Sequence, residues 1–178
     1  MSRCESDGAC VRVVTLPAWA VVTPARRAHI ERVAALLSQW ADALHVPQAE
    51  RDRWLKAAWL HDALRDAPLP DELAHGPVAA ERALHEGEAD RGVLDAVRYH
   101  TIGYAGWDDV GRMLYLADFL EPGRDFDRAA RAALAARVPA ERDVVLREVA
   151  ARRIAWVVRS GWPLPRETVD FWNALASR

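Results

Sequence analysis

The chain has 178 residues, of which 51% are hydrophobic and 28% are charged, and its formal net charge is −2. This length and composition are typical of a single globular domain that can bury its own core. No apolar run approaches the roughly 18 residues of a membrane-spanning helix, and the polar beginning lacks the apolar core of a secretion signal, so we expect a cytoplasmic protein without a membrane partner. The charge is also unlike the basic footprint of sequence-independent nucleic-acid binding, so no nucleic-acid partner is expected.

Residues 1–22 form the segment with the least readable pattern. Within it, residues 11–22 are apolar but interrupted by Pro17, and they are compatible with a short strand, a turn of helix or a packed arm. No linker, internal repeat or low-complexity segment divides the rest of the chain. We therefore expect an N-terminal arm over residues 1–22 and one domain over residues 23–178.

The rest of the chain has the spacing and punctuation of helices. Thr23 is a suitable N-cap, Pro24 suits the first helical position, and apolar residues then recur at helical spacing up to Leu44. The sequence predicts helices over residues 24–44, 47–61, 78–85, 90–100, 107–120, 127–137, 139–160 and 165–175. No segment alternates as strands do, so the expected fold class is all-α, a single bundle of about eight helices.

Several common catalytic motifs do not occur in the sequence. It has no Gly-rich phosphate loop, no dinucleotide-binding GxGxxG pattern and no GxSxG elbow, and no Ser lies near a His along the chain. Cys4 and Cys10 both lie in the N-terminal arm, so neither a disulfide framework nor a cysteine nucleophile is expected. The remaining candidate chemistry is that of His and Asp.

Four His and two Asp occupy positions that look inward from different helices or helix ends. They are His29, His61, Asp62, His75, His100 and Asp118. Any one of them alone would be interpreted as a core polar residue with its hydrogen bonds satisfied, and His45 and His85 near helix ends are interpreted in that structural way. A buried carboxylate is costly unless it is paired, protonated or bound to a metal. Together, these imidazoles and carboxylates favour an ion of the iron, manganese or zinc type.

The order of these residues resembles a known signature. His29, His61-Asp62 and Asp118 are similar to the H…HD…D pattern of the HD-domain metal-dependent phosphohydrolases, an all-helical superfamily. Residues 99–124, YHTIGYAGWDDVGRMLYLADFLEPGR, resemble one branch, the YqeK-type symmetrical bis(5'-nucleosyl)-tetraphosphatases, in their HT-x-G and LAD-x-x-EP-x-R motifs. The stretches RRAH, HDALR and HGPVAAE and the closing GWPLPRETVDFWNAL fit the same branch. The resemblance covers about residues 24–176, so the expected domain over 23–178 is an HD phosphohydrolase domain.

The resemblance implies symmetrical hydrolysis of diadenosine tetraphosphate to two ADP by metal-activated hydroxide. The implied cofactor is a divalent or mixed-valence transition metal, with iron expected and manganese the alternative, as one or two ions per chain. The implied ligands of the first metal are His29, His61, Asp62 and Asp118, while His75 and His100 would hold a second metal or contact phosphate.

The resemblance also implies roles for residues around the metal. The implied catalytic residues are Asp62 and Arg65, and the implied substrate-binding residues are Arg65, Arg98, Thr101 and Arg124. Each of three residues also has a structural interpretation. Arg98 can be a solvated helix residue, Thr101 can cap a turn, and Arg124 can be a surface residue after a turn. Arg65 stands where the family usually has Lys, and Tyr104 stands where a basic residue is expected. Both departures leave the exact nucleotide open.

Three other functions remain as alternatives. The first is a different HD phosphohydrolase, acting on a nucleoside monophosphate, a cyclic dinucleotide or (p)ppGpp. The second is a non-catalytic module that senses a nucleotide, and the third is a helical scaffold, which would have to bury Asp62 and Asp118 without a metal. A substrate panel separates the first from the tetraphosphatase.

The tryptophans are expected mainly in the core. Trp40, Trp54, Trp59 and Trp156 lie on apolar helical faces. Trp107, in the loop after HT-x-G, could stack on adenine, but packing of the loop is the favoured interpretation. Exposed apolar faces on an Ala-rich helix could form a homodimer, although nothing in the sequence selects it.

Overall fold

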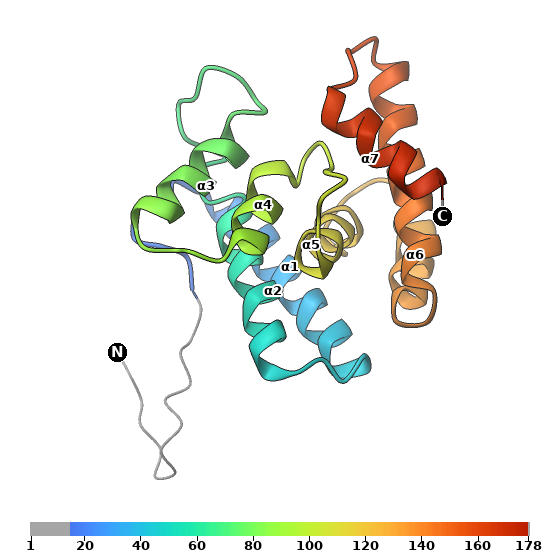
Figure 1. Cartoon of the computed structure of the whole chain (residues 1–178), viewed down its shortest axis with the longest axis horizontal. Helices are drawn as coiled ribbons and strands as arrows, with labels where there is room; N and C mark the ends of the chain where they lie inside the picture. The colour runs from blue at the N-terminus through green and yellow to red at the C-terminus, as the bar shows by residue number, and fades with distance from the viewer. Residues whose placement is uncertain (1–14, 178) are drawn as a thin grey trace.

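The computed structural model describes residues 15–177 and contains only helices within that range (Figure 1). The helices are α1 (Pro24–Ala43), α2 (Gln48–His61), α3 (His75–His85), α4 (Arg91–Tyr99), α5 (Asp109–Leu120), α6 (Arg128–Arg159) and α7 (Arg166–Ala176). The all-α prediction is therefore confirmed. Residues 15–22 belong to no helix or strand, and Val21 donates a backbone hydrogen bond to the carbonyl of Ala63.

Two predicted helix boundaries differ from the structure for reasons that involve proline. The third helix begins at His75, three residues before the predicted start, because Pro77 is tolerated in a first helical turn. Residues 127–137 and 139–160, predicted as two helices, are joined within α6 but are separated by a kink, which confirms the predicted break and moves it a few residues along the chain. The break that Pro139 introduces lies inside α6, where Glu141 leaves helical geometry with φ −133° and ψ 37°.

Helix α5 is the centre of the core. It packs against α1, α2 and α4 on one side and α6 on the other (Figure 1). Nearly all of its residues are buried, including Met113, Leu114 and Leu116, as expected for a helix that is apolar all round. Asp118 therefore lies in the interior of the molecule, and it is the only charged residue of α5 that is buried.

The starts of α4 and α5 are tied together by one guanidinium group. Asp90 and Asp108 are the N-caps of the two helices and accept hydrogen bonds from Val93 N and Val110 N. Arg53 of α2 contacts both carboxylates at 2.7 Å, and its hydrogen bonds to Asp90 hold the pKa of that carboxyl below its usual value. These contacts orient the two helices that carry His100 and Asp118.

A close approach of backbones sets the position of α3 against α4. A Cβ atom on Gly76 would lie 2.9 Å from the carbonyl oxygens of Val97 and Arg98. Glycine at this position therefore allows the beginning of α3 to pack directly on the end of α4. His75 and His100, which adjoin this contact, are brought together as a result.

The tryptophans follow the prediction with one exception. Trp40 and Trp54 are buried, and Trp107 is buried in an edge-to-face contact with Phe171, which confirms that it packs the loop. The prediction for Trp156 is wrong, because its side chain is 54% exposed. It lies near the end of α6, beside α7 (Figure 1), and an apolar helical spacing there does not produce burial.

Some sequence expectations lie outside what the structure tests. Cys4, Cys10 and the rest of residues 1–14 are outside the described residues, and the boundary between an arm and a domain at residues 22 and 23 stays a prediction. Within residues 15–177, no helix is both long enough and apolar enough to cross a membrane. The cytoplasmic location and the homodimer remain predictions.

Candidate metal centre

Six buried side chains from five helical segments meet beside α5. His29 comes from α1, His61 and Asp62 from the end of α2, His75 from the first position of α3, His100 from the residue after α4, and Asp118 from α5. All six are at most 6% exposed. The structure thus brings together the complete set of metal-ligating residues predicted from the sequence.

The cluster consists of two ligand groups that share Asp62. His29, His61 and Asp62 offer donor atoms within 4.8 Å of one another, and so do Asp62, His75 and His100. Asp62 Oδ2 lies 3.6 Å from His29 Nε2, whereas Asp62 Oδ1 lies 3.2 Å from His75 Nε2. Each oxygen of this carboxylate therefore faces a different group. Asp118 joins the first group, with Oδ1 at 3.2 Å from His29 Nε2.

The hydrogen bonds of the imidazoles fix which nitrogen faces the centre. The Nδ1 atoms of His61, His75 and His100 lie 2.6–2.8 Å from the backbone carbonyls of Ala58, Glu72 and Val97. A carbonyl accepts only, so each Nδ1 carries a proton and Nε2 is the nitrogen that faces the cluster.

The Nε2 atoms lie unusually close together for groups of this kind. The distance is 3.0 Å between His75 and His100, and 3.3 Å between His61 and His29. Facing lone pairs repel unless a cation or a proton lies between them. This donor set fits divalent transition-metal ions, which imidazole and carboxylate groups bind together.

The electrostatics of the centre favour the ligating forms of His61, Asp62 and Asp118. Burial lowers the pKa of His61 to about 4, so its imidazole is neutral at pH 7. Burial raises the pKa of both Asp62 and Asp118. Around Asp62, His61, His100 and His75 outweigh this effect of burial. Around Asp118, Arg153 and His29 outweigh it. Both carboxyl pKa values therefore lie well below the usual range, and both groups are ionised.

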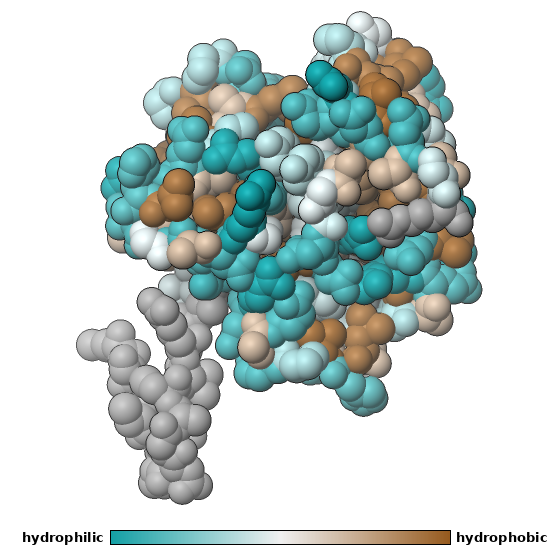
Figure 2. Space-filling view, in the orientation of Figure 1, coloured by the Kyte–Doolittle hydropathy of each residue, from teal (hydrophilic) through white to brown (hydrophobic). Residues whose placement is uncertain are grey.

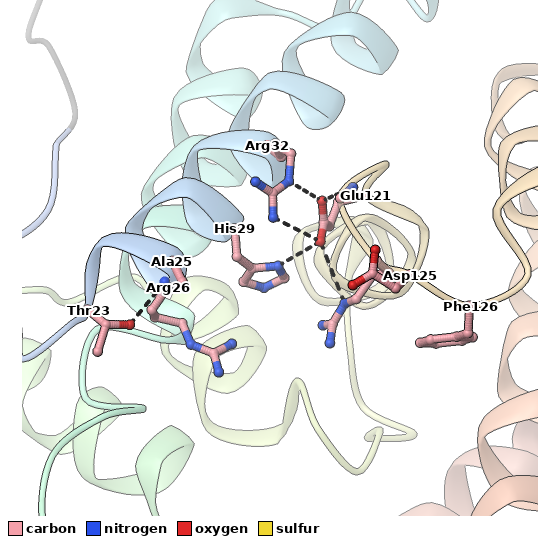
Figure 3. A pocket seen from close by; sticks show the side chains of 10 residues that line it. Thr23, Ala25, Arg26, His29, Arg32, Glu121, Asp125 and Phe126 are labelled. Carbon is pink, nitrogen blue, oxygen red and sulfur yellow. Dashed lines mark hydrogen bonds and ion pairs between the residues drawn. The ribbon is translucent and has the colours of Figure 1, made fainter.

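Glu121 supports the centre and was not singled out by the sequence. It is 1% exposed, directly after α5, and accepts hydrogen bonds from His29 Nδ1, Arg32 and the backbone N–H of Gly123 (Figure 3). Burial raises the pKa of Glu121, but the hydrogen bonds from His29 and Arg32 outweigh it and bring the pKa to about 2. A carboxylate behind a ligating imidazole fixes its orientation and increases its basicity.

Replacing Glu121 with glutamine should weaken metal binding by about 10–100-fold, which is typical for loss of such a supporting partner. The amide keeps the shape of the side chain but removes the charge that holds His29. Competition between the protein and a chelator for Mn²⁺ measures the dissociation constant. Glu31→Gln, on the exposed face of the same α1 helix, is the matched control. An equal affinity in both variants would contradict the supporting role of Glu121.

Arginines surround the carboxylates of the centre. Arg124, predicted as a substrate-binding residue, donates to Asp118 Oδ1 at 2.8 Å. Two others were missed: Arg26 contacts Asp62 Oδ2 and Arg153 contacts Asp118 Oδ2, each at 2.7 Å. Arg26 belongs to the RRAH stretch, whose resemblance to the family was a sequence signal for a role of this residue at the site. Arg153 lies 35 residues beyond Asp118 and carried no signal.

The other predicted substrate-binding residues differ in whether they line a cavity at the centre. Arg65 and Thr101 line the larger cavity at the centre, and Thr101 Oγ1 lies 3.2 Å from His100 Nε2. Arg65 donates to the carbonyl of Glu72 rather than to a ligand residue. Arg98 lines neither of the two cavities at the centre and lies 3.9 Å from Glu81.

Two hollows open onto the centre. The larger, of about 1100 Å³, is lined by Asp62, His75, His100 and Asp118 together with residues of α6. The smaller, of about 420 Å³, contains His29, Arg32 and Glu121 (Figure 3). Arg26, Arg124 and Phe126 line both hollows, so the two spaces share two cationic side chains beside the cluster.

Comparison with known families agrees with this geometry. A model of the HD domain family matches residues 26–149, which is well over half of the chain and includes all six clustered residues. The chain belongs to the HD domain family. A crystal structure of a predicted HD superfamily hydrolase involved in NAD metabolism, from Clostridium acetobutylicum, superimposes with a TM-score of 0.77 over 88% of this chain and 92% of that one. At 23% identity, this likeness shows the HD fold alone.

Three curated relatives of this HD protein share one name, symmetrical bis(5'-nucleosyl)-tetraphosphatase. The Staphylococcus aureus relative is 29% identical over 103 residues, covering 57% of this chain and 53% of the relative. The Bacillus subtilis relative is 45% identical over 56 residues, covering 31% and 30%. The Halalkalibacterium halodurans relative is 28% identical over 106 residues, covering 59% and 56%. The matched part of this chain thus spans about half of two relatives and less than a third of the other.

Proposed function

We propose that this HD protein is a metal-dependent phosphohydrolase that cleaves dinucleoside tetraphosphates symmetrically, converting diadenosine tetraphosphate and water to two ADP. The observation that carries the proposal is the pair of buried ligand groups that share Asp62 and open into an arginine-lined cavity. The common name of the three relatives supports the choice of substrate.

The proposed ligands of the first metal are His29, His61, Asp62 and Asp118, and those of the second are Asp62, His75 and His100. Iron is the proposed metal, with manganese as the alternative. A metal bound there lowers the pKa of a water molecule and polarises a phosphoryl oxygen. Asp62 connects the two ligand groups, because its two carboxylate oxygens face different imidazoles.

The arginines have the chemistry to bind and orient a polyphosphate. Arg26, Arg124 and Arg153 carry their charge into the cavity beside the ligand carboxylates. Guanidinium groups bind phosphate oxygens through paired N–H donors, and they stabilise the charge that grows on those oxygens during phosphoryl transfer. Arg65 and the hydroxyl of Thr101 are proposed to contact the same chain of phosphates from the wall of the cavity.

The arrangement of the hollows supports a cut in the middle of the substrate. Symmetrical hydrolysis leaves a nucleoside diphosphate on each side of the bond that breaks. His29 lines the smaller hollow, four of the other proposed ligands line the larger one, and Arg26 and Arg124 line both. One half of a tetraphosphate can therefore extend into each hollow while its central phosphates contact the shared arginines.

Metal content and reaction products, measured on the same protein, test the proposal. Elemental analysis of aerobically and anaerobically purified protein should give one or two iron or manganese ions per chain. Chromatography of the products from diadenosine tetraphosphate should give ADP alone. ATP plus AMP would refute the symmetrical cut, and bound metal without turnover would refute this substrate. Protein that binds no metal under either condition would refute the proposed centre itself.

A further inference from the structure

Two exposed tryptophans form a corner at the junction of α6 and α7. The rings of Trp156 and Trp162 are 5.0 Å apart between centroids and stand at 87° to each other. Their side chains are 54% and 53% exposed, which is unusual for residues of this size. Figure 2 shows hydrophobic residues gathered in the same region, over the end of α6 and the beginning of α7. We call this pair the tryptophan corner.

The tryptophan corner belongs to the same hollow as the metal ligands. The cavity that reaches Asp62, His75 and His100 is also lined by Trp156, Trp162 and Pro163. Its volume of about 1100 Å³ slightly exceeds the range of about 300–1,000 Å³ for pockets that hold drug-sized ligands. A polyphosphate alone would leave the apolar end of this space unfilled.

The helix that carries Trp156 also contributes positive charge to the cavity. Arg152, Trp156 and Arg159 follow one another at the spacing of a single helical face, and all three line the cavity. The next residue, Arg153, reaches Asp118 Oδ2 and lies over the ring of Tyr115. Anionic and aromatic parts of one ligand would therefore find their partners along the same stretch of α6.

We propose that the tryptophan corner binds the nucleobase of one half of the substrate. This inference rests on the proposed function, because it names where a nucleoside of the dinucleotide lies. A base is flat, has aromatic faces and is joined to a phosphate chain, so it matches an exposed indole next to arginines. Stacking on an indole tolerates every base, so the corner holds a nucleoside without selecting adenine.

Only one such surface is assigned per chain. The smaller hollow contains a single aromatic side chain, Phe126, and no tryptophan. The substrate is therefore held unequally, with one base stacked on the tryptophan corner and the other half retained through its phosphates by Arg26, Arg32 and Arg124.

Binding of ADP and of pyrophosphate to metal-loaded protein separates the base from the phosphates. Trp156→Ala and Trp162→Ala should each weaken ADP by about tenfold or more, the loss typical of removing a stacking residue, and leave pyrophosphate unchanged. Trp156→Phe should recover most of the affinity for ADP, because a ring is restored. The matched control is Val158→Ala, since Val158 is 57% exposed on the same helix end but does not line the cavity.

The outcomes distinguish this inference from the proposed function, since binding of ADP requires no turnover. Equal losses for ADP and pyrophosphate, or no loss for either, would overturn the tryptophan corner. A lower molecular mass of Trp156→Ala in sedimentation would also overturn it, because the corner would then be a contact between two copies of the chain. Variants that lose affinity for ADP but not for pyrophosphate would support the corner, whatever the activity of the wild-type protein. A wild-type protein that left diadenosine tetraphosphate intact would refute only the proposed function.

Discussion

Replacing Asp62 with asparagine is expected to have the largest effect on activity, a fall in kcat of at least about a thousandfold. Loss of a metal that contributes several kcal/mol to the transition state corresponds to a factor of this size. Asp62 is the only residue common to both ligand groups, and its two oxygens face different imidazoles. The asparagine amide carries no charge and replaces one of these oxygens with an N–H donor, so both groups should lose metal together. Elemental analysis and kcat measure the two effects.

The matched control for this change is Asp95→Asn. Asp95 pairs with the exposed Arg91 of α4 and lines neither cavity at the centre, so its variant should keep both metal and activity. Circular dichroism of Asp62→Asn checks that the helices remain. Wild-type activity in Asp62→Asn would overturn the assignment of Asp62, and so would a full complement of metal.

The second large effect is expected at Gly76, which carries no functional group. An added methyl group in Gly76→Ala would meet the carbonyl oxygens of Val97 and Arg98 at 2.9 Å, and these are backbone atoms of α4 that cannot rotate away. Overpacking of this kind costs about 1–3 kcal/mol. Relief of the clash moves α3 away from α4 and separates His75 from His100. Urea unfolding and metal content should therefore show lower stability and loss of the ion bound by Asp62, His75 and His100.

The matched control is a substitution on the same helix that removes a methyl group instead of adding one. Ala79 is fully buried in α3, and Ala79→Gly should cost about 1 kcal/mol through helix propensity without pushing α3 away from α4. The control should therefore be destabilised but retain its metal. If both variants kept the same metal content, the close contact at Gly76 would not be what positions His75.

The helices were largely predictable because their boundaries are encoded locally. The side chain of Thr23 accepts the expected hydrogen bond from Arg26 N, and α1 begins at Pro24. Tertiary contacts decided what the sequence could not. The kink near Pro139 lies at Glu141, and Trp156 is 54% exposed although its spacing is that of an apolar face. An apolar periodicity identifies a face of a helix, but it does not show whether another element covers that face.

The clustering of the six candidate ligands could be predicted because burying His and Asp on several helices has few other physical explanations. The residues that surround them were harder to find. Glu121 acts through His29, and Arg153 reaches Asp118 from another helix, so neither has a spacing that indicates its partner. Arg98 shows the opposite case, since a position close to His100 in sequence does not bring its side chain to the cavity. Adjacency along a helix end leaves the direction of a side chain open.

The peripheral position of α7 has a consequence for how this protein can change. All six ligand residues precede the end of α5, and the match to the HD family ends at residue 149. Helix α7 packs on α6 and on no other helix to a similar extent. The last turns of α6 and all of α7 can therefore be exchanged for those of another HD protein without altering a ligand, provided that Arg153 is kept beside Asp118. The candidate metal ligands and the proposed tryptophan corner are thus encoded in separable stretches of the gene, which gives protein engineering and natural divergence a way to alter one while preserving the other.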